Sequence, residues 1–394
     1  MKMVFAHDHY FIHHGEKVYS PGKLPYSAFT RYLHHFDQVT VLSRYKNDSS
    51  FSPYWTLASG HGMVFKKIEN HSSLKSVLFT CHKNIIEIKD TLRGCDGVVV
   101  RLPSETGLIT AKIARQMNIP YLVELVACPW DAMIGYGSLK GFLYAPVLSW
   151  RVRQAVKKAW GAIYVTGSFL QKRYPIKYNG VSASNVDLLP ASLSVLNQRC
   201  DKIATSSGGP FKIGLIASLD SPHKGFDTIY RAVYRLKNKG VPVILEITGG
   251  GSKFKNSPLI DKLLLHDNII FSGPKTSGEG IFSFLDTVDL YVQPSNQEGL
   301  PRAVIEAMSR ACPVITSSAG GMPELCQRHY LHKPNDDHTL ANNIEYLLKN
   351  RQEMLSMAHH SFNTARLYQP ELLMKIRFDL FTRYKNHMLS LRNA

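Results

Sequence analysis

Residues 290–308 read LYVQPSNQEGLPRAVIEAM, and this stretch decides the fold class. Its first residues, Leu290 to Val292, form a short apolar run that is typical of a buried strand. Pro301 then opens a segment with helical periodicity, and proline is favoured in the first turn of a helix. A buried strand, a tight turn and a helix in this order predict one unit of an α/β fold.

Two glutamates flank the start of this helix. Glu298 lies in the loop before Pro301, and Glu306 lies about two turns further along. Gly299 allows the backbone between them to approach a ligand, because it has no side chain. The helix N-terminus adds unpaired N–H groups and a partial positive charge, which attract a phosphate. The stretch therefore predicts a sugar-nucleotide site. A surface helix with two solvated glutamates is the alternative.

The same strand, turn and helix pattern recurs through the C-terminal half, with strands expected at residues 211–216, 243–248, 269–271, 290–292 and 314–316. After the first of these, Lys224-Gly225 supplies a cation and a permissive backbone beside a helix start, which suits a diphosphate. Gly250, in the middle of a run of three glycines, lies in a loop that could approach the nucleotide. Simple chain reversal explains that loop equally well.

The N-terminal half alternates in the same way, which predicts a parallel sheet. Strands are expected at residues 2–6, 38–42, 63–65, 97–100, 121–125 and 161–165, and helices at 26–33, 106–117 and 141–159.

Ligands of such sheets bind at the carboxyl ends of the strands. Gly15, in the loop of residues 13–23, and the charged residues Arg101, Glu124 and Asp131 follow expected strands, so they are candidates for contacts with an acceptor. Each charged residue could equally be a local cap or an ion-pair partner.

Composition suggests where the domains meet. Residues 196–210 are rich in polar residues and end in Gly-Gly-Pro, which suits an interdomain linker. The expected units are an N-terminal domain at 1–195, this linker, a C-terminal domain at 211–370 and a terminal helix at 371–394.

The chain of 394 residues is long enough for two domains that each bury a core. Its formal net charge of +17 favours anionic partners: nucleotide diphosphates, nucleic acid or an acidic membrane surface. Met1 to Ala6 is too short for the apolar core of a signal peptide, and no uncharged run approaches the ~20 residues of a membrane span. We expect a soluble cytoplasmic protein, at most peripheral on the inner face of a membrane.

Neither cysteines nor histidines indicate a metal site. Six cysteines are widely separated, without a Cys-x-x-Cys pair, so a reduced cytoplasmic protein is expected rather than a disulfide framework or a zinc site. Four histidines cluster near the N-terminus but have no companion cysteine or spaced carboxylates, so packing or hydrogen bonding is favoured over metal binding. The four are His7, His9, His13 and His14.

The spacing Glu298-x7-Glu306, with Gly-Leu-Pro after the first glutamate, resembles the motif of retaining glycosyltransferases of family 4. The segments Pro313 to Thr316 and Gly320-Gly321-Met322-Pro323-Glu324 strengthen that resemblance, which covers roughly residues 211–350. It implies the GT-B fold, an α/β architecture of two Rossmann-like domains facing a cleft. It also implies a terminal helix that crosses back to the N-terminal domain.

The resemblance assigns roles to individual residues. Glu298 would contact the hydroxyls of the donor sugar, Glu306 the ribose hydroxyls, and the amides of Gly299 and Leu300 the sugar or diphosphate. Lys224 would bind the diphosphate. Ser218 stands where many members of the family have an arginine, so part of the usual neutralisation of charge must be absent or come from elsewhere.

The activity implied is retaining transfer of a sugar from a nucleotide-diphosphate sugar to a hydroxyl of a glycan or lipid-linked acceptor, as in bacterial surface polysaccharide synthesis. Catalysis would be electrostatic and independent of metal, with Lys224, Glu298 and Asp131 as the catalytic candidates and no protein nucleophile. Two alternatives stay open. One is a GT-B sugar-nucleotide epimerase or phosphorylase, and the other is a non-catalytic basic protein that binds nucleic acid or anionic lipid.

Overall fold

The computed structural model describes most of the chain. The described residues are 1–21, 24–48, 51–53, 55–69, 74–135, 139–205 and 209–393, with backbone only at 74–81. Gly22 and Lys23 of the first candidate loop, residues 206–208 of the expected linker and the side chain of Cys81 lie outside this set. The other five cysteines are free thiols.

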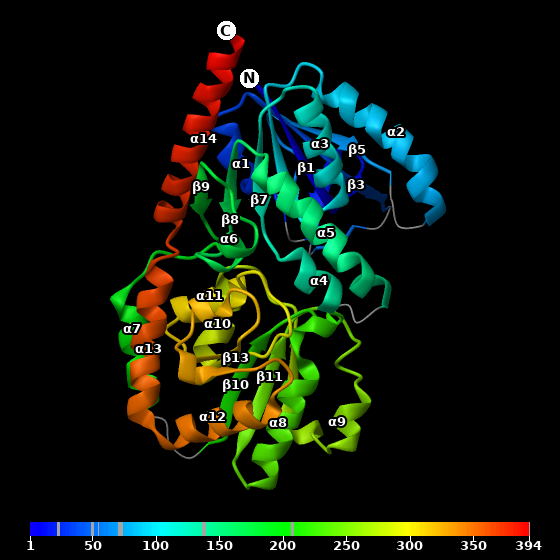
Figure 1. Ribbon diagram of the computed structural model, residues 1–394. Coiled ribbons are helices and arrows are strands. Elements are labelled where there is room, and N and C mark those ends of the chain that lie inside the picture. Colours follow the sequence, from blue (N-terminus) through cyan, green and yellow to red (C-terminus); the bar gives the residue numbers. More distant parts are fainter. Residues whose placement is uncertain are drawn as a thin grey trace.

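The N-terminal domain is built on a mainly parallel sheet (Figure 1). Its parallel strands have the spatial order β5-β3-β1-β6-β7-β8-β9. β2 pairs antiparallel with the last residues of β1, and β4 pairs antiparallel with β2. The bounds are β1 Lys2–His14, β2 Lys17–Ser20, β3 Gln38–Asn47, β4 Thr56–Leu57, β5 Met63–Lys67, β6 Gly97–Leu102, β7 Tyr121–Leu125, β8 Gly161–Tyr164 and β9 Gly180–Ser182.

Helices cover both faces of this sheet, which explains why every residue of β6 and β7 is buried. The helices are α1 Ser27–Leu33, α2 Leu74–Leu92, α3 Glu105–Gln116, α4 Pro129–Gly135, α5 Leu139–Lys157 and α6 Phe169–Arg173. The start of α3 is fixed by Ser104, whose hydroxyl accepts from the Gly107 amide at 2.8 Å.

The C-terminal domain has a six-stranded parallel sheet in the described residues, with the order β12-β11-β10-β13-β14-β15. Numbered along the domain this is 3-2-1-4-5-6, the order of a dinucleotide-binding fold. The strands are β10 Phe211–Ile216, β11 Val243–Thr248, β12 Ile269–Gly273, β13 Leu290–Gln293, β14 Val314–Ser317 and β15 Leu331–His332. In such a sheet the connections leave β10 and β13 in opposite directions, so a crevice for ligands opens between these two strands.

The helices of this domain lie on both sides of its sheet (Figure 1). They are α8 Phe226–Asn238, α9 Pro258–Lys262, α10 Glu279–Thr287, α11 Arg302–Ser309, α12 Asp337–Lys349 and α13 Arg351–Arg366. Short 3-10 turns are η1 Pro222–Lys224, η2 His266–Asn268, η3 Met322–Glu324 and η4 Arg328–Tyr330. α8 has a strongly one-sided apolar pattern, and its buried face includes Phe226, Ile229 and Val233.

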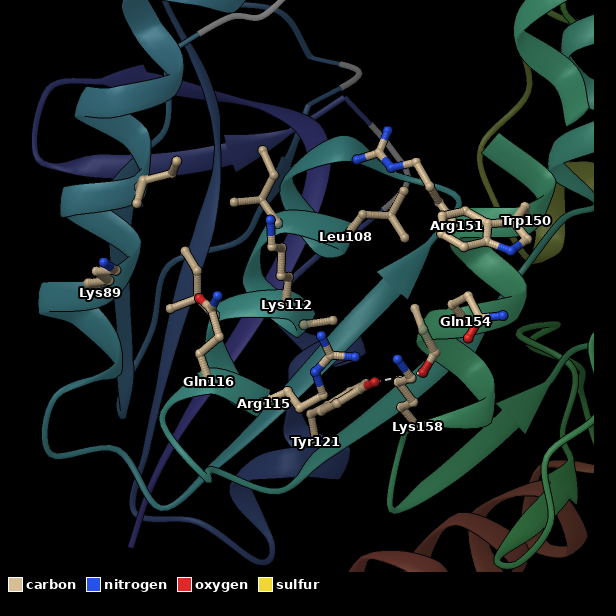
Figure 2. Close-up of a pocket in the computed structure, with 15 residues that line it drawn as sticks. Lys89, Leu108, Lys112, Arg115, Gln116, Tyr121, Trp150, Arg151, Gln154 and Lys158 are labelled. Carbon is tan, nitrogen blue, oxygen red and sulfur yellow. Dashed lines mark hydrogen bonds between the residues drawn. The ribbon is translucent and has the colours of Figure 1, made fainter. Parts of the chain in front are cut away.

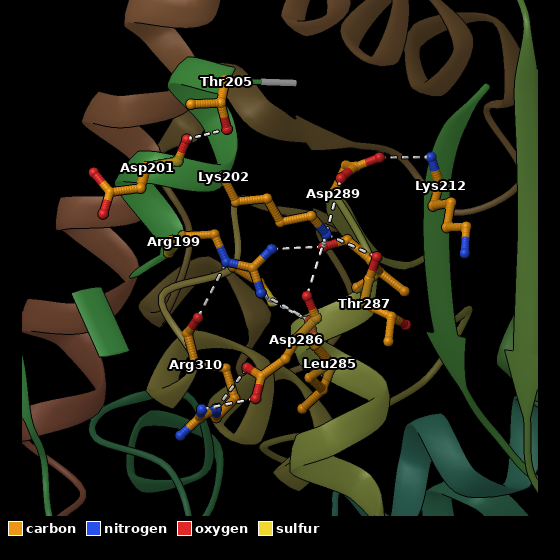
Figure 3. A network of polar contacts seen from close by, with 12 residues as sticks. Arg199, Asp201, Lys202, Thr205, Lys212, Leu285, Asp286, Thr287, Asp289 and Arg310 are labelled. Carbon is orange, nitrogen blue, oxygen red and sulfur yellow. Dashed lines mark hydrogen bonds and ion pairs between the residues drawn. The ribbon is translucent and has the colours of Figure 1, made fainter. Parts of the chain in front are cut away.

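The segment expected as a linker is instead helical through most of its described length. α7, Leu193–Thr205, packs beside α13 and is fixed to the C-terminal domain by two basic residues (Figure 3). Arg199, which is buried, donates to the carbonyl oxygens of Leu285 and Val288, and Lys202 forms a 3.0 Å ion pair with Asp289. Composition suggested an interdomain linker because most polar residues of this helix lie on its exposed face, while Leu196, Arg199 and Ile203 are buried.

The last helix, α14 Pro370–Arg392, returns from the C-terminal domain to the N-terminal sheet, where it lies beside α1 and β9 (Figure 1). Its Tyr384 hydroxyl donates to the Pro120 carbonyl oxygen at 2.6 Å, and accepts from the Val98 amide at 3.0 Å. Arg377 donates to the carbonyl oxygen of Ala183 at 3.1 Å. α14 therefore ties the two domains together on one side of the molecule.

Candidate functional site

Lys224 and Glu298 meet at the carboxyl ends of the two central strands of the C-terminal sheet. Lys224 ends η1, after β10, and Glu298 follows β13. Lys224 Nζ lies 2.6 Å from Glu298 Oε1, and both side chains are largely shielded from solvent. A cation and a carboxylate thus occupy the point where the strand order reverses and where folds of this type bind ligands.

Backbone contacts hold the two loops together. Gly225 has φ of +73°, and a Cβ at this position would lie 2.0 Å from the carbonyl oxygen of Pro294. The amide of Asn296 donates to the carbonyl oxygen of His223 at 2.8 Å. Only glycine satisfies both the left-handed conformation and the close approach at position 225, so the sequence Lys-Gly sets the position of Lys224.

A buried chain of hydrogen bonds orients Glu298. The Tyr291 hydroxyl donates to Gln293 Oε1 at 2.7 Å, and Gln293 Nε2 donates to Ser295 Oγ at 2.8 Å. Ser295 Oγ in turn donates to Glu298 Oε1 at 2.8 Å. The sequence analysis missed Gln293 and Ser295 as supporting residues. The signal was present, because polar residues that end an apolar strand need partners when they are buried.

Glu306 lies on α11, half-buried, two turns beyond the loop of Glu298. Burial raises the pKa of Glu306 above its ordinary value, with the charge of Arg302 acting against this and that of Asp187 in the same direction. A carboxylate that has lost part of its solvation is suited to accept hydrogen bonds from hydroxyl groups.

Arg302 is a further cation that the sequence analysis did not single out. It is the first residue of α11 and is exposed. Its charge acts on Glu306 and also on Arg101 of the N-terminal domain. It stands at the helix N-terminus, where both the guanidinium and the helix dipole favour an anion.

Gly299 makes room for a close contact between the two domains. A Cβ at this position would lie 2.3 Å from the carbonyl oxygen of Val126, which follows β7 of the N-terminal domain. Gly320 and Gly321 likewise leave room for the carbonyl oxygens of Glu298 and Gly299. These glycines thus allow close contact between protein backbones at the domain junction, and Leu300 beside them is buried.

The two remaining donor-side candidates lie close to the same crevice. Ser218 follows β10 and is exposed. Gly250 has open space around its Cα, and its carbonyl oxygen accepts from the Leu219 amide at 2.7 Å. The neighbours Gly249 and Gly251 have positive φ, and a Cβ on either would collide with residues of the Ala217 to Asp220 loop. The glycine run is therefore explained by tight packing of two loops.

Arg101 and Glu124 form a buried pair inside the N-terminal domain. Arg101 Nε lies 3.6 Å from Glu124 Oε2, and the Tyr32 hydroxyl donates to Glu124 Oε1 at 2.6 Å. Burial by itself would raise the pKa of Glu124, but the guanidinium groups of Arg101 and Arg31 hold it below its ordinary value. This geometry favours the ion-pair interpretation over direct contact with an acceptor for both residues.

Asp131 also has a local partner. It lies in the first turn of α4, and its carboxylate accepts two hydrogen bonds from Arg173, at 2.8 and 2.9 Å. Gly15 has φ of +60° and forms the turn between β1 and β2, with open space beside its Cα. The structure accordingly explains Asp131 by an ion pair and Gly15 by turn geometry.

The carboxylate of Glu324 joins the two domains. Glu324, in η3, accepts from the amides of Ser168 and Phe169 at 3.0 and 2.6 Å, and also from the amide of Gly167. These three amides lie at the start of α6 in the N-terminal domain. A residue of the C-terminal domain therefore caps a helix of the other domain.

The four histidines of the N-terminal cluster have separate environments. β1 extends to His14, beyond the expected end at Ala6, so they belong to the strand rather than to a loop. Burial, with the charge of Arg101 next, lowers the pKa of His7 to about 3, and Nδ1 of the neutral ring donates to the Arg101 carbonyl oxygen at 3.2 Å. In the part of the chain that the structure describes, no group of three or more potential metal ligands converges.

Comparison with known proteins identifies relatives of this chain. The sequence profile of the family described as "Glycosyl transferases group 1" matches residues 202–363. Protein CapJ of Staphylococcus aureus is 32% identical over 356 residues, which cover 89% of this chain and 88% of CapJ. A putative colanic acid biosynthesis glycosyltransferase, WcaL of Escherichia coli K12, is 31% identical over 145 residues, 34% of this chain and 35% of that protein.

Among solved structures, Anabaena Alr3699/HepE in complex with UDP and glucose superposes with a TM-score of 0.67 at 16% identity. The superposition covers 98% of this chain and 99% of that one. This similarity confirms the predicted GT-B fold.

Proposed function

The chain belongs to the group 1 glycosyl transferases, and from this premise we propose that it transfers a sugar from a nucleotide-diphosphate sugar to a hydroxyl with retention at the anomeric carbon. The observation that carries the proposal is the Lys224–Glu298 pair at the reversal of strand order. Its cation suits a diphosphate, and its carboxylate suits sugar hydroxyls.

In this proposal the donor binds mainly to the C-terminal domain. Its diphosphate takes Lys224 away from Glu298, so the carboxylate becomes available to the hydroxyls of the sugar. Glu306 accepts from the ribose hydroxyls, and the amides of Gly299 and Leu300 and the loop of Gly250 lie toward the sugar and nucleotide.

Arg302 is proposed to share with Lys224 the stabilisation of negative charge on the donor. A nucleoside diphosphate leaving group concentrates negative charge on its β-phosphate, and Ser218 supplies no cation there. Lys224, Arg302 and the N-terminus of α11 are positive groups that could stabilise this charge in the transition state. We propose that these groups suffice without a metal ion, and that the leaving phosphate itself helps to deprotonate the acceptor.

The N-terminal domain would receive the acceptor, a glycan or a lipid-linked glycan, in surface polysaccharide synthesis. The relationship to WcaL, named for colanic acid biosynthesis, supports this choice. Contacts between the domains at Gly299 and at Glu324 would exclude water, which would otherwise hydrolyse the donor. For a lipid-linked acceptor we propose peripheral association with the cytoplasmic face of a membrane.

The experiment is a thermal-shift screen of the purified chain against nucleoside diphosphates and sugar nucleotides, because stabilisation follows ligand occupancy. The donor found is then incubated with candidate acceptors, and NMR determines the anomeric configuration of the product. Inversion would contradict the retaining mechanism. Turnover without any acceptor to an epimer would favour an epimerase, and stabilisation by none of the nucleotides would contradict the proposal as a whole.

A further inference from the structure

The outer face of α5 is apolar, although this face is exposed. Its exposed side chains are Leu139 (76% exposed), Phe142 (58%), Leu143 (68%), Val147 (48%) and Trp150 (62%). The opposite face of the helix packs on the domain through Ala145, Leu148, Val152 and Val156. The spacing of the exposed residues places them along one stripe. We call the five exposed residues the α5 face.

A large exposed apolar stripe of this kind marks a surface that is covered in use. Trp130 and Ile134 of α4 are exposed as well, and α4 and α5 pack against each other. The end of α4 touches the other domain, because Gly135 leaves room for Gln297. The apolar surface therefore starts beside the domain junction and runs outward along α5.

The chain segment that contains α5 is strongly basic. The sequence from residue 132 to residue 186 contains no Asp or Glu and eight basic residues, which are Lys140, Arg151, Arg153, Lys157, Lys158, Lys172, Arg173 and Lys177. The exposed Lys157 and Lys158 follow the apolar stripe directly. An apolar face flanked by cations is the pattern of a helix that lies in the interface of an anionic membrane.

A groove of about 670 Å³ beside α5 extends the pattern (Figure 2). It lies between α2, α3 and α5, and Leu108, Ala111 and Tyr121 are among the residues of its mainly apolar lining. Basic side chains from all three segments surround it: Lys89, Lys112, Arg115, Arg151 and Lys158. Arg151 is paired with Glu105. The other four have no ion-pair partner among the residues that the structure describes, so they are available to lipid phosphates.

We propose that the α5 face and the basic rim of this groove form a docking surface for an anionic lipid bilayer. The apolar residues enter the boundary between head groups and acyl chains, while the cations contact lipid phosphates. This inference rests on the proposed function in one respect: it places the domain junction next to the membrane, where a lipid-linked acceptor would be presented. None of the helices in the described parts of the chain is long and apolar enough to cross a membrane.

The test is flotation of the purified full chain with vesicles of phosphatidylglycerol and phosphatidylcholine, compared with phosphatidylcholine alone, at low and high salt. Two double variants are compared with wild type: Phe142→Ser with Leu143→Ser, and Lys157→Gln with Lys158→Gln. Each should reduce the partition coefficient on anionic vesicles by roughly tenfold or more. Salt should weaken wild-type binding.

Matched controls come from exposed residues of the C-terminal domain. Leu264→Ser changes a side chain that is 72% exposed, and Lys262→Gln with Lys275→Gln removes two exposed charges. These controls should bind vesicles as wild type does. Emission from Trp150 should shift to shorter wavelength on binding, and Trp150→Phe should remove most of that shift.

Several results would overturn the proposal. The first is that Phe142→Ser with Leu143→Ser binds anionic vesicles as well as wild type does. The second is that wild type binds neutral and anionic vesicles equally. The third is that wild type binds no vesicles and forms a dimer, and that this double variant is monomeric. Sugar transfer to a water-soluble acceptor is measured on the same variants, and it separates the docking surface from the proposed transferase activity. A variant that loses vesicle binding but keeps this transfer supports the docking surface. Absence of transfer in wild type would contradict the proposed function and leave the flotation result intact.

Discussion

Lys224 Nζ lies 2.6 Å from Glu298 Oε1, although 74 positions separate the two residues along the chain. Each residue follows one of the two strands between which the strand order of the C-terminal sheet reverses. The ion pair holds the site in place before a ligand arrives. In the proposed function a diphosphate would compete with Glu298 for the lysine, and this competition would couple donor binding to release of the carboxylate.

Lys224→Ala should lower the rate of sugar transfer more than it weakens donor binding, because negative charge on the leaving diphosphate grows toward the transition state. A loss on the order of 100-fold in turnover is typical for removal of one such group. The measurement is single-turnover transfer at saturating donor, with donor affinity from calorimetry. Ser218→Arg in the same background should restore part of the rate. A wild-type rate in Lys224→Ala would exclude the role.

Arg302→Gln should weaken donor binding by roughly 10- to 100-fold, since a charge-assisted hydrogen bond contributes about 1.5–3 kcal/mol. The matched control is Arg328→Gln, an exposed arginine at the start of η4 in the same domain. Calorimetry with the nucleoside diphosphate compares the two. Equal affinities for Arg302→Gln and the control would show that the α11 arginine takes no part.

Glu306→Gln should weaken nucleotide binding and stabilise the unliganded protein at neutral pH. Burial raises the pKa of Glu306, so its stabilising contribution is present below the unfolded pKa and is lost as the pH rises through the folded pKa. Glutamine stays neutral at every pH. The free energy of unfolding of Glu306→Gln should therefore exceed that of wild type by an amount that grows from about pH 4 to neutral pH and stays below about 2 kcal/mol. Melting curves across this range test the sign. Unchanged nucleotide affinity would contradict the ribose assignment.

Gly299→Ala should disturb the domain junction, because its Cβ would meet the Val126 carbonyl oxygen at 2.3 Å. We expect a larger radius of gyration in X-ray scattering and a loss of transfer activity, while each domain keeps its fold. Gly209→Ala is the control, since nothing lies within 4 Å of the Cβ position there. An unchanged scattering curve for Gly299→Ala would mean that the junction adapts without separation.

Glu324→Gln should loosen the same junction from its other side. The carboxylate accepts from backbone amides at the start of α6, and charge-assisted hydrogen bonds contribute about 1.5–3 kcal/mol. Glu279→Gln, at the start of α10 within the C-terminal domain, removes a comparable charge without an interdomain contact. Thermal melting and scattering of the two variants give the comparison. If both behave alike, the interdomain cap does not stabilise the closed arrangement.

The local sequence determined the elements and the class of fold. Apolar runs such as Leu290–Val292, helix starts such as Pro301 and their alternation along the chain predicted parallel α/β sheets, and the family resemblance predicted the GT-B arrangement. These features are local because strand burial and helix periodicity are recorded within a few neighbouring residues. Lys224 and Glu298 were recognised individually from the turns that carry them.

Tertiary structure alone decided which residues meet. For Arg101 and Glu124 the sequence left acceptor contacts and ion pairing open, and the pairing of β6 with β7 brings the two residues together inside the domain. Gly299 predicted a close approach of the backbone to a ligand, and the structure adds a close approach to the Val126 carbonyl oxygen of the other domain. Such contacts depend on strand order and domain packing, which join residues far apart in the chain, so no local pattern of the sequence records them.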